Sequence, residues 1–345
     1  MKRSLVTGVA YHGNRMLSHV RADMAEIAGA DMDLVVHMFS HNDWERHKSV
    51  MKEILAITRD AGLASWVDNW GLAGEPGDRS HFLAYHPEER MIGQGGVPHP
   101  FLACFNSPVF RQFVKDWTYT VREIGGETVF WDEPMFRPVV LSETDKRYVC
   151  CCARCQTKFE ERFHHPMPNE ATDEVVAFRM ETLLDFFREV TEYSHSLGMG
   201  NALCCETSIP PETVASLCTL PYVDSMGADP YWYGDPAVKA YPFVYEGASR
   251  LLRQTEAAGI DHNLWIQSYN APRGREEEIV EACTAAYDAG ARTLIAWGYR
   301  GSEANDYRSE NPERAWLCTV EGMRLVRWEE RRRIWEENRK NVKKN

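Results

Sequence analysis

Residues 173–206 read DEVVAFRMETLLDFFREVTEYSHSLGMGNALCCE, and this stretch contains one complete unit of the predicted fold. The apolar residues of 173–197 recur with the period of an α-helix, and Gly198 is suited to end that helix. The apolar run at 200–206 is typical of a buried strand. A helix that ends at glycine and leads into a buried strand is the repeating step of an alternating α/β fold.

The same step recurs along the chain. Further helical patterns at 43–61, 245–258 and 275–289 are followed by Gly62, Gly259 and Gly290. Apolar runs predict eight strands, at 4–10, 33–39, 64–70, 128–134, 200–206, 224–231, 263–269 and 293–299. Eight β–α units in 345 residues predict one α/β domain covering 1–345, a (β/α)8 TIM barrel.

Two connections are too long to hold a single helix, and they follow strands three and four at 71–127 and 135–199. Both leave the carboxyl end of the barrel, where catalytic groups gather in this fold. Near the end of the chain we expect a basic C-terminal helix at about 313–345. Residues 324–345 hold nine Lys or Arg against four Glu, and we expect the face with Trp328 and Trp335 to dock on the barrel.

The composition is that of an ordinary globular protein, with 44% hydrophobic and 26% charged residues. A net charge of −12 argues against nucleic acid as the main partner, and no apolar run approaches the length of a membrane span. The amino terminus reads as a first strand rather than a secretory signal. The ten cysteines are therefore expected to be reduced thiols or metal ligands in a cytoplasmic protein, with a homo-oligomer left open.

Cysteines are concentrated at 150–157, which read CCCARCQT. Cys150, Cys152 and Cys155 form a C-x-C-x-x-C pattern, and Cys104 in the first long connection can supply a fourth thiolate. Four thiolates favour a tetrahedral zinc ion and leave it no open position, so the predicted metal is structural. It would fasten the two long connections to each other over a substrate pocket. A chance clustering of buried cysteines is the alternative.

These segments resemble the zinc-binding segments of glycoside hydrolase family 42, which contains many bacterial β-galactosidases. The resemblance rests on CFNSPVFR from Cys104, on the cysteine run from Cys150, and on FWDEP at 130–134 between them. It implies a carbohydrate substrate, and it places Glu133 at the family's acid/base position at the end of strand four. Asp132 stands where the family usually has Asn. The further domains that follow the barrel in that family are not expected here.

The predicted strand ends are rich in carboxylates and aromatic rings, which a sugar site uses for acid–base chemistry and for stacking. Glu133 is the main candidate for the general acid, because crowding by Asp132 and partial burial raise the pKa of one of the two. Asp229 and Glu206 are candidates for the base or the nucleophile. The alternative for Asp229 is a strand end packed under a loop, and the alternative for Glu206 is a structural ion pair. The expected substrate-binding residues are His12, His37, Asp68, Trp70, Asp132, Tyr231, Gln267, Tyr269 and Trp297.

The end of strand seven departs from the family pattern. The resemblance implies a nucleophilic Glu there, and this chain has Gln267. A neutral amide cannot form a glycosyl ester, so we do not expect the family's double displacement unchanged. Either Asp229 or Glu206 acts as an inverting base or a relocated nucleophile, or the substrate supplies its own nucleophile, or the barrel no longer hydrolyses glycosides. We favour the first.

Two other functions stay open. His37, Asp68, Glu133 and Glu206 could surround an open divalent ion, as in a metal-dependent sugar isomerase, epimerase or lyase. Alternatively, Gln267 indicates a barrel that binds sugar without catalysis. The sequence lacks the nucleophile elbow of α/β-hydrolases, the P-loop and the dinucleotide-binding fingerprint.

Overall fold

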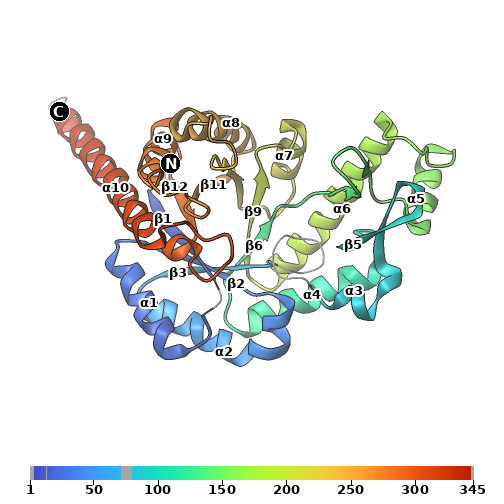
Figure 1. Cartoon of the computed structure of the whole chain (residues 1–345), viewed down its shortest axis with the longest axis horizontal. Helices are drawn as coiled ribbons and strands as arrows, with labels where there is room; N and C mark the ends of the chain where they lie inside the picture. Colours follow the sequence, from blue (N-terminus) through green and yellow to red (C-terminus); the bar gives the residue numbers. More distant parts are fainter. Residues whose placement is uncertain (1–3, 13, 71–79, 343–345) are drawn as a thin grey trace.

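The computed structural model describes residues 4–12, 14–70 and 80–342, so 71–79 of the first long connection and 343–345 of the predicted last helix lie outside the described part. Its central element is a closed barrel of eight parallel strands, in the order β1-β12-β11-β10-β9-β6-β3-β2 (Figure 1). The strands are β1 (Val6–Tyr11), β2 (Leu34–Met38), β3 (Ala64–Asp68), β6 (Thr128–Asp132), β9 (Gly200–Glu206), β10 (Ser225–Asp229), β11 (Asp261–Gln267) and β12 (Thr293–Trp297). The predicted (β/α)8 barrel is confirmed, because each predicted strand overlaps one of these.

Helices surround the barrel. They are α1 (Leu17–Gly29), α2 (His41–Asp60), α4 (Pro108–Glu123), α6 (Asp173–Ser196), α7 (Pro211–Cys218), α8 (Ala240–Ala258), α9 (Glu278–Ala289) and α10 (Pro312–Val342), with the 3-10 segment η3 (Tyr299–Ser302) after β12. The four glycines predicted to end helices have φ between 72° and 109°, a left-handed conformation that favours glycine. Among the described helices, none combines the length and the apolar character needed to cross a bilayer.

The direction of a side chain on a strand follows the alternation of the pleat. Val36 of β2 packs inside the barrel with Phe130 and Trp265, whereas the preceding Val35 packs in the outer core with the helices. All five residues of β2 are buried, because one face meets the barrel interior and the other meets the helices. Burial therefore does not distinguish the inward-facing residues from the outward-facing ones.

The two long connections form a lobe beside the barrel, at the right of Figure 1. The first contains α3 (Phe82–Tyr85), η1 (Pro87–Glu89), η2 (Gln94–Gly96) and a two-stranded sheet of β4 (Arg90–Gly93) and β5 (Val97–Ala103). The second contains a smaller sheet of β7 (Val139–Val140) and β8 (Lys146–Arg147), followed by α5 (Ala153–Phe163). This lobe stands next to the carboxyl ends of β3 and β6.

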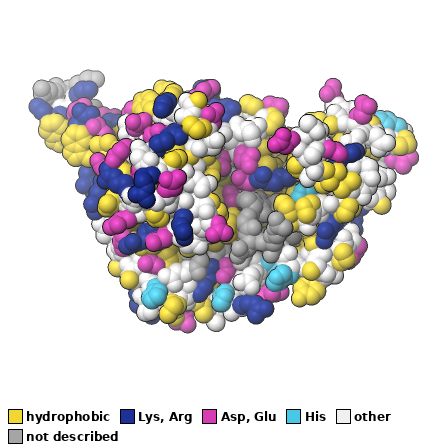
Figure 2. Space-filling view, in the orientation of Figure 1, with side chains coloured by type: hydrophobic (Ala, Val, Ile, Leu, Met, Phe, Trp, Pro, Cys, Tyr) yellow, Lys and Arg dark blue, Asp and Glu magenta, His cyan; other side chains and the backbone are white. Residues whose placement is uncertain are grey.

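The C-terminal helix α10 docks on the barrel through its first half. Trp316, Met323 and Val326 are buried there. Trp328 and Trp335 are 57% and 56% exposed, and hydrophobic side chains are visible on the part of α10 that projects from the barrel (Figure 2). The expectation that these two tryptophans dock is therefore wrong, because Trp328 lies on the outward side of α10, whose inward side still contacts α9 at Glu330, and Trp335 lies beyond that contact.

Candidate functional site

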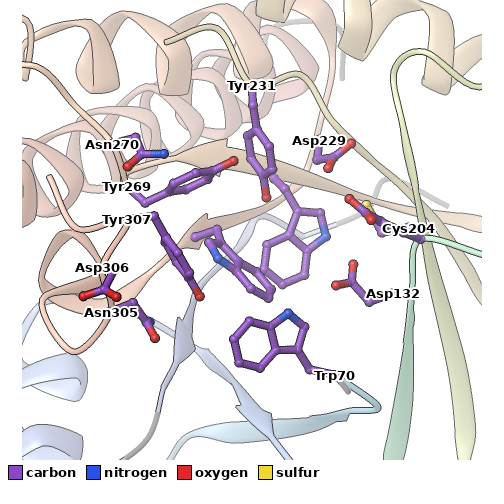
Figure 3. A pocket seen from close by; sticks show the side chains of 13 residues that line it. Trp70, Asp132, Cys204, Asp229, Tyr231, Tyr269, Asn270, Asn305, Asp306 and Tyr307 are labelled. Atoms are coloured by element: carbon purple, nitrogen blue, oxygen red, sulfur yellow. The ribbon is translucent and has the colours of Figure 1, made fainter. Parts of the chain in front are cut away.

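A cavity of about 660 Å³ opens at the carboxyl end of the barrel, inside the ring of strand ends (Figure 3). Its volume is within the range of small-molecule sites. Six aromatic residues, four acidic residues, two asparagines and one cysteine line it: Trp70, Tyr231, Trp265, Tyr269, Trp297, Tyr307, Asp132, Glu133, Asp229, Asp306, Asn270, Asn305 and Cys204. No Lys, Arg or His is found among these lining residues of the described chain.

Two buried aspartates stand on the same wall of the cavity. Asp132 ends β6 and Asp229 ends β10, and β9 runs between them, with Asp132 paired in register to Cys204 and Asp229 to Glu206. Figure 3 shows both carboxyl groups on the side of the cavity where Cys204 lies. The two residues are 8% and 7% exposed. Asn69 fixes the end of β6, because its Oδ1 accepts the backbone N–H of Asp132 at 3.1 Å.

Burial raises the pKa of both aspartates, because an ionised carboxyl group loses its solvation inside the protein. The pKa of Asp132 rises to about 7, through burial that the Arg137 guanidinium opposes and the Glu206 carboxylate reinforces. The pKa of Asp229 rises well above its ordinary range, through burial and then through the charges of Asp132 and Glu206. Arg137 offsets the effect of burial mainly at Asp132, whereas Asp229 also lies near the charges of two other carboxyl groups, so the protonated form is favoured more strongly at Asp229.

Arg137 joins the two predicted catalytic glutamates. Its Nη2 pairs with Glu133 Oε2 and lies 3.0 Å from Glu206 Oε1, and Ser208 Oγ donates to Glu206 Oε2 at 3.0 Å. A guanidinium stabilises the ionised form of a carboxyl group. One guanidinium thus engages both glutamates. Glu133 lines the cavity, whereas Glu206 lies beyond the lining.

Aromatic rings form the other walls of the cavity. Tyr231 and Tyr269 meet edge to face with their ring centroids 5.2 Å apart, and Trp265 and Trp297 do so at 5.3 Å. Such contacts hold the rings in fixed orientations. The flat faces of these rings are suited to stack on the C–H faces of a sugar ring, and the tyrosine hydroxyl groups are suited to bind its hydroxyl groups.

His12 and Asp68, two of the predicted substrate-binding residues, lie behind the lining. The His12 ring is buried, with its centroid 4.9 Å from that of Trp297 and 5.4 Å from that of Trp70. Burial lowers the pKa of His12 to about 4, so the ring is neutral at physiological pH. Asp68 is fully buried at the end of β3. His12 therefore supports the aromatic wall instead of forming part of it.

Gln267 and His37, two of the predicted substrate-binding residues, have hydrogen-bond partners within the protein. Gln267 Oε1 accepts the backbone N–H groups of Trp232 and Tyr233, at 2.7 and 2.9 Å, and so anchors the loop after β10. His37 faces the helix layer, because it follows the inward-facing Val36, and its Nε2 lies 2.9 Å from Thr58 Oγ1. Burial lowers the pKa of His37 to about 3.

Six lining residues were absent from the prediction. Cys204 and Trp265 precede the predicted Glu206 and Gln267 by two positions, so strand alternation could have indicated them. The other four, Asn270, Asn305, Asp306 and Tyr307, lie in the connections after β11 and β12, where no periodic pattern marks them. The backbone N–H of Asn270 donates to the backbone oxygen of Tyr307 at 2.9 Å, which links these two connections.

The four predicted metal ligands come together in the lobe. The Sγ atoms of Cys104, Cys150, Cys152 and Cys155 all lie within 4.8 Å of one another. Cys104 Sγ is 3.4 Å from that of Cys155 and 3.7 Å from that of Cys152. Thiolates around a tetrahedral zinc ion at about 2.3 Å stand roughly 3.8 Å apart, so this cluster is compatible with such an ion. Cys151 stays outside the cluster.

Within the described residues, this cluster is the one group of three or more Cys, His, Asp or Glu side chains that could hold a metal. The open metal site expected for a sugar isomerase would use His37, Asp68, Glu133 and Glu206 as ligands. The structure does not bring these four side chains together, because His37 faces away from the cavity and Glu133 and Glu206 are paired with Arg137.

No protein-family model matches the chain, and no curated protein matches it in sequence. Solved structures with a similar fold include the catalytic domain of β-amylase from Paenibacillus polymyxa, at 6% identity and a TM-score of 0.65, covering 92% of this chain and 98% of that one. A β-galactosidase from the psychrophilic Marinomonas ef1 is similar at 11% identity and a TM-score of 0.68, covering 94% of this chain and 59% of that one.

A GH5_18 protein from Streptomyces cattleya, solved in complex with GlcNAc, is similar at 14% identity and a TM-score of 0.56, covering 95% of this chain and 81% of that one. An L-ribulose 3-epimerase also shares the fold, at a TM-score of 0.51. At these identities the similarity concerns the fold, which is a TIM barrel of the kind found in glycoside hydrolases and in sugar epimerases.

Proposed function

We propose that this barrel hydrolyses a glycosidic bond in a small oligosaccharide or glycoside bound in the cavity. The observation that carries the proposal is the Asp132–Asp229 pair, two buried carboxyl groups of unequal acidity in an aromatic-lined cavity. Groups whose surroundings separate their acidities are suited to act as acid and base at one pH. The glycosidase-like fold supports the same assignment.

Asp229 is the proton donor in this scheme, and Asp132 is the base. Water attacks the anomeric carbon while Asp132 takes one of its protons. The bond from the anomeric carbon to the leaving oxygen breaks, and Asp229 protonates that oxygen. β9 separates the backbones of the two aspartates by roughly 9–10 Å, twice the ordinary strand spacing. An inverting hydrolysis requires the acid and the base on opposite faces of the sugar ring, so in this scheme the scissile bond lies between the Asp132 and Asp229 side chains.

This scheme changes the role expected of Glu133. Its ion pair with Arg137 opposes proton donation, although the resemblance to family 42 puts an acid at this position. Gln267 cannot serve as a nucleophile, since its amide is neutral and its oxygen holds two backbone N–H groups. We therefore assign Glu133 to binding substrate hydroxyl groups and to holding Arg137 in place.

We further propose that the cysteine cluster binds a structural zinc ion. Cys104 belongs to the first long connection, and Cys150, Cys152 and Cys155 belong to the second. Four thiolates fill a tetrahedral coordination shell, so an ion bound here would stabilise the lobe and take no part in the chemistry. Its contribution would be to fix the connections that border the cavity.

Proton NMR of wild-type cleavage tests the proposed reaction. The zinc-loaded protein would be incubated with α- and β-glycosides of common hexoses and with short oligosaccharides, and the first-formed anomer would be identified. We expect cleavage with inversion. Retention would overturn the Asp132–Asp229 scheme in favour of a covalent intermediate. No cleavage of any compound would overturn the hydrolase proposal and favour a sugar-binding barrel.

A further inference from the structure

The charge of the cavity indicates which class of sugar it accepts. We propose that the bound sugar carries a protonated amine, so that the substrate is an amino-sugar glycoside. The inference rests on the proposed function for its reaction, but the claim about binding can be tested without any turnover.

Acidic groups dominate the cavity. Asp132, Glu133, Asp229 and Asp306 line it, and the described lining contains no Lys, Arg or His. Arg137, which lies beyond the lining, is already engaged by Glu133 and Glu206. An acidic, partly enclosed cavity repels uronates, sialates and sugar phosphates and attracts a cation.

A buried oxygen on the cavity wall requires a donor. Asp229 is 7% exposed, and its Oδ1 has no hydrogen-bond partner in the described chain. Buried polar atoms are normally hydrogen-bonded, and Asp229 lines the cavity, so a ligand toward which this carboxyl group turns can supply the missing donor. An ammonium group brings three N–H donors and no acceptor, so it can donate to the carbonyl oxygen of protonated Asp229 and to the Asp132 carboxylate together.

The aromatic walls complement the same cation. The faces of Trp and Tyr rings carry a negative potential that attracts ammonium groups. Trp70, Tyr231 and Tyr269 present such rings around the space that Asp132 and Asp229 border in Figure 3. Aromatic faces combined with nearby carboxylates are a common way of recognising amines. A sugar with hydroxyl groups alone would not balance the negative charge of these carboxylates.

The number of carboxylates exceeds what hydrolysis needs. One acid and one base are sufficient for an inverting reaction. Asp306 lies across the cavity from Asp132 and Asp229, as Figure 3 shows, so negative charge is present on two sides of the bound sugar. A cationic substrate gives these additional carboxylates a function in binding.

Calorimetric binding of matched monosaccharides tests the inference. D-glucosamine would be compared with D-glucose, D-galactosamine with D-galactose, and each amine with its N-acetyl form and with D-glucuronate. The pH would be about 7, where a sugar amine is largely protonated. We expect at least one amine to bind ten times more tightly than its hydroxyl parent and its N-acetyl form, and no binding of glucuronate. Equal or weaker binding of both amines would overturn the inference.

Two variants test whether the amine preference arises at this site. Asp132→Asn should abolish the preference for the amine over its hydroxyl parent, with the unfolding midpoint measured to confirm that the variant is folded. Glu246→Gln, at an exposed position on α8, should leave all affinities unchanged. A preference that survives in Asp132→Asn would contradict the site assigned here.

Failure of this inference and failure of the proposed function give different results. An amine preference without cleavage of any glycoside leaves an amino-sugar binding site and removes the hydrolase. Cleavage of neutral glycosides without an amine preference keeps the hydrolase and removes only the inference about the substrate.

Discussion

Three of the four clustered cysteines lie within six residues of one another, whereas the cavity draws its lining from positions spread between Trp70 and Tyr307. The cluster lies in the lobe, on loops and at the start of α5. Three of its ligands are close because they are close in the sequence, and the fold of the lobe brings Cys104 to them. The cavity lies at the end of the barrel, and its side chains meet only because eight strands close into a ring. Local spacing thus predicts the first site, and the second depends on the fold.

The two sites also differ in the groups that they leave available to a ligand. Four thiolates leave a metal no open position, so the cluster is suited to structure. The cavity contains two carboxyl groups of unequal acidity and an oxygen without a partner in the described chain, so it is suited to a ligand and a reaction. Variants in the cavity should therefore change turnover, and variants in the cluster should change stability.

The largest expected effect is on turnover. Asp132→Asn should reduce kcat/KM about 10²–10⁴-fold, the usual contribution of a general base, with little change in the unfolding midpoint. Glu133→Gln is the matched control, since it makes the same acid-to-amide change at the adjacent residue and should cost less. If Glu133→Gln costs more than Asp132→Asn in steady-state kinetics, the acid–base role belongs to Glu133, as the resemblance implied.

Next in size is the effect of the cluster on stability. Cys155→Ser, or zinc removal by a chelator, should lower the free energy of unfolding by about 3–4 kcal/mol, the stabilisation that a ligand provides at 100 to 1,000 times its Kd. Urea unfolding and zinc analysis measure the change. Cys151→Ser is the control, because Cys151 lies in the same run and outside the cluster. Equal zinc loss in both variants would contradict the ligand assignment.

The third prediction concerns whether Gln267 stabilises the fold or binds substrate. Gln267→Met keeps the approximate volume but leaves the N–H groups of Trp232 and Tyr233 without their acceptor. We expect a loss of about 1–3 kcal/mol in unfolding free energy. Gln112→Met, at an exposed position on α4, should change stability by less than about 0.5 kcal/mol. A weaker affinity for sugar at unchanged stability would mean that Gln267 contacts substrate after all.

The pH dependence should follow Asp132. Its pKa of about 7 means that the base is protonated and inactive below that pH. The value of kcat/KM should therefore rise about tenfold per pH unit up to about pH 7 and then level off. Stability should change in the opposite direction, because a carboxyl group with a raised pKa favours folding at low pH and loses that contribution as pH rises towards 7. A rate that falls between pH 5 and 7 would contradict the assignment.

The sequence was sufficient to predict the barrel, because helices that end at glycine and lead into apolar strands recur along the chain. It was not sufficient to predict the direction in which each strand-end side chain points. His12 and His37 both belong to predicted strand ends, yet only His12 is on the inward side. Strands buried on both faces show no polar alternation, so nothing in the local pattern marks the inner face.

Other parts of the cavity depend on connections that have no regular pattern. Asn305, Asp306 and Tyr307 follow η3, and Arg137 lies in the connection after β6. Arg137 forms an ion pair with Glu133, and a sequence motif cannot show that ion pair. The family resemblance directed attention to the end of this strand, where Asp132 and Glu133 line the cavity, but it could not divide the acid and base roles between these neighbouring carboxyl groups.

The measurement that tests the central claim most directly is turnover of a series of aryl glycosides with graded leaving groups by wild type and Asp229→Asn. A proton donor is needed most where the leaving oxygen is basic. The variant should therefore lose about 10²–10⁴-fold on poor leaving groups and much less on activated ones. A loss that is the same across the series, or a wild type that cleaves none of the glycosides, would contradict hydrolysis with Asp229 as the donor.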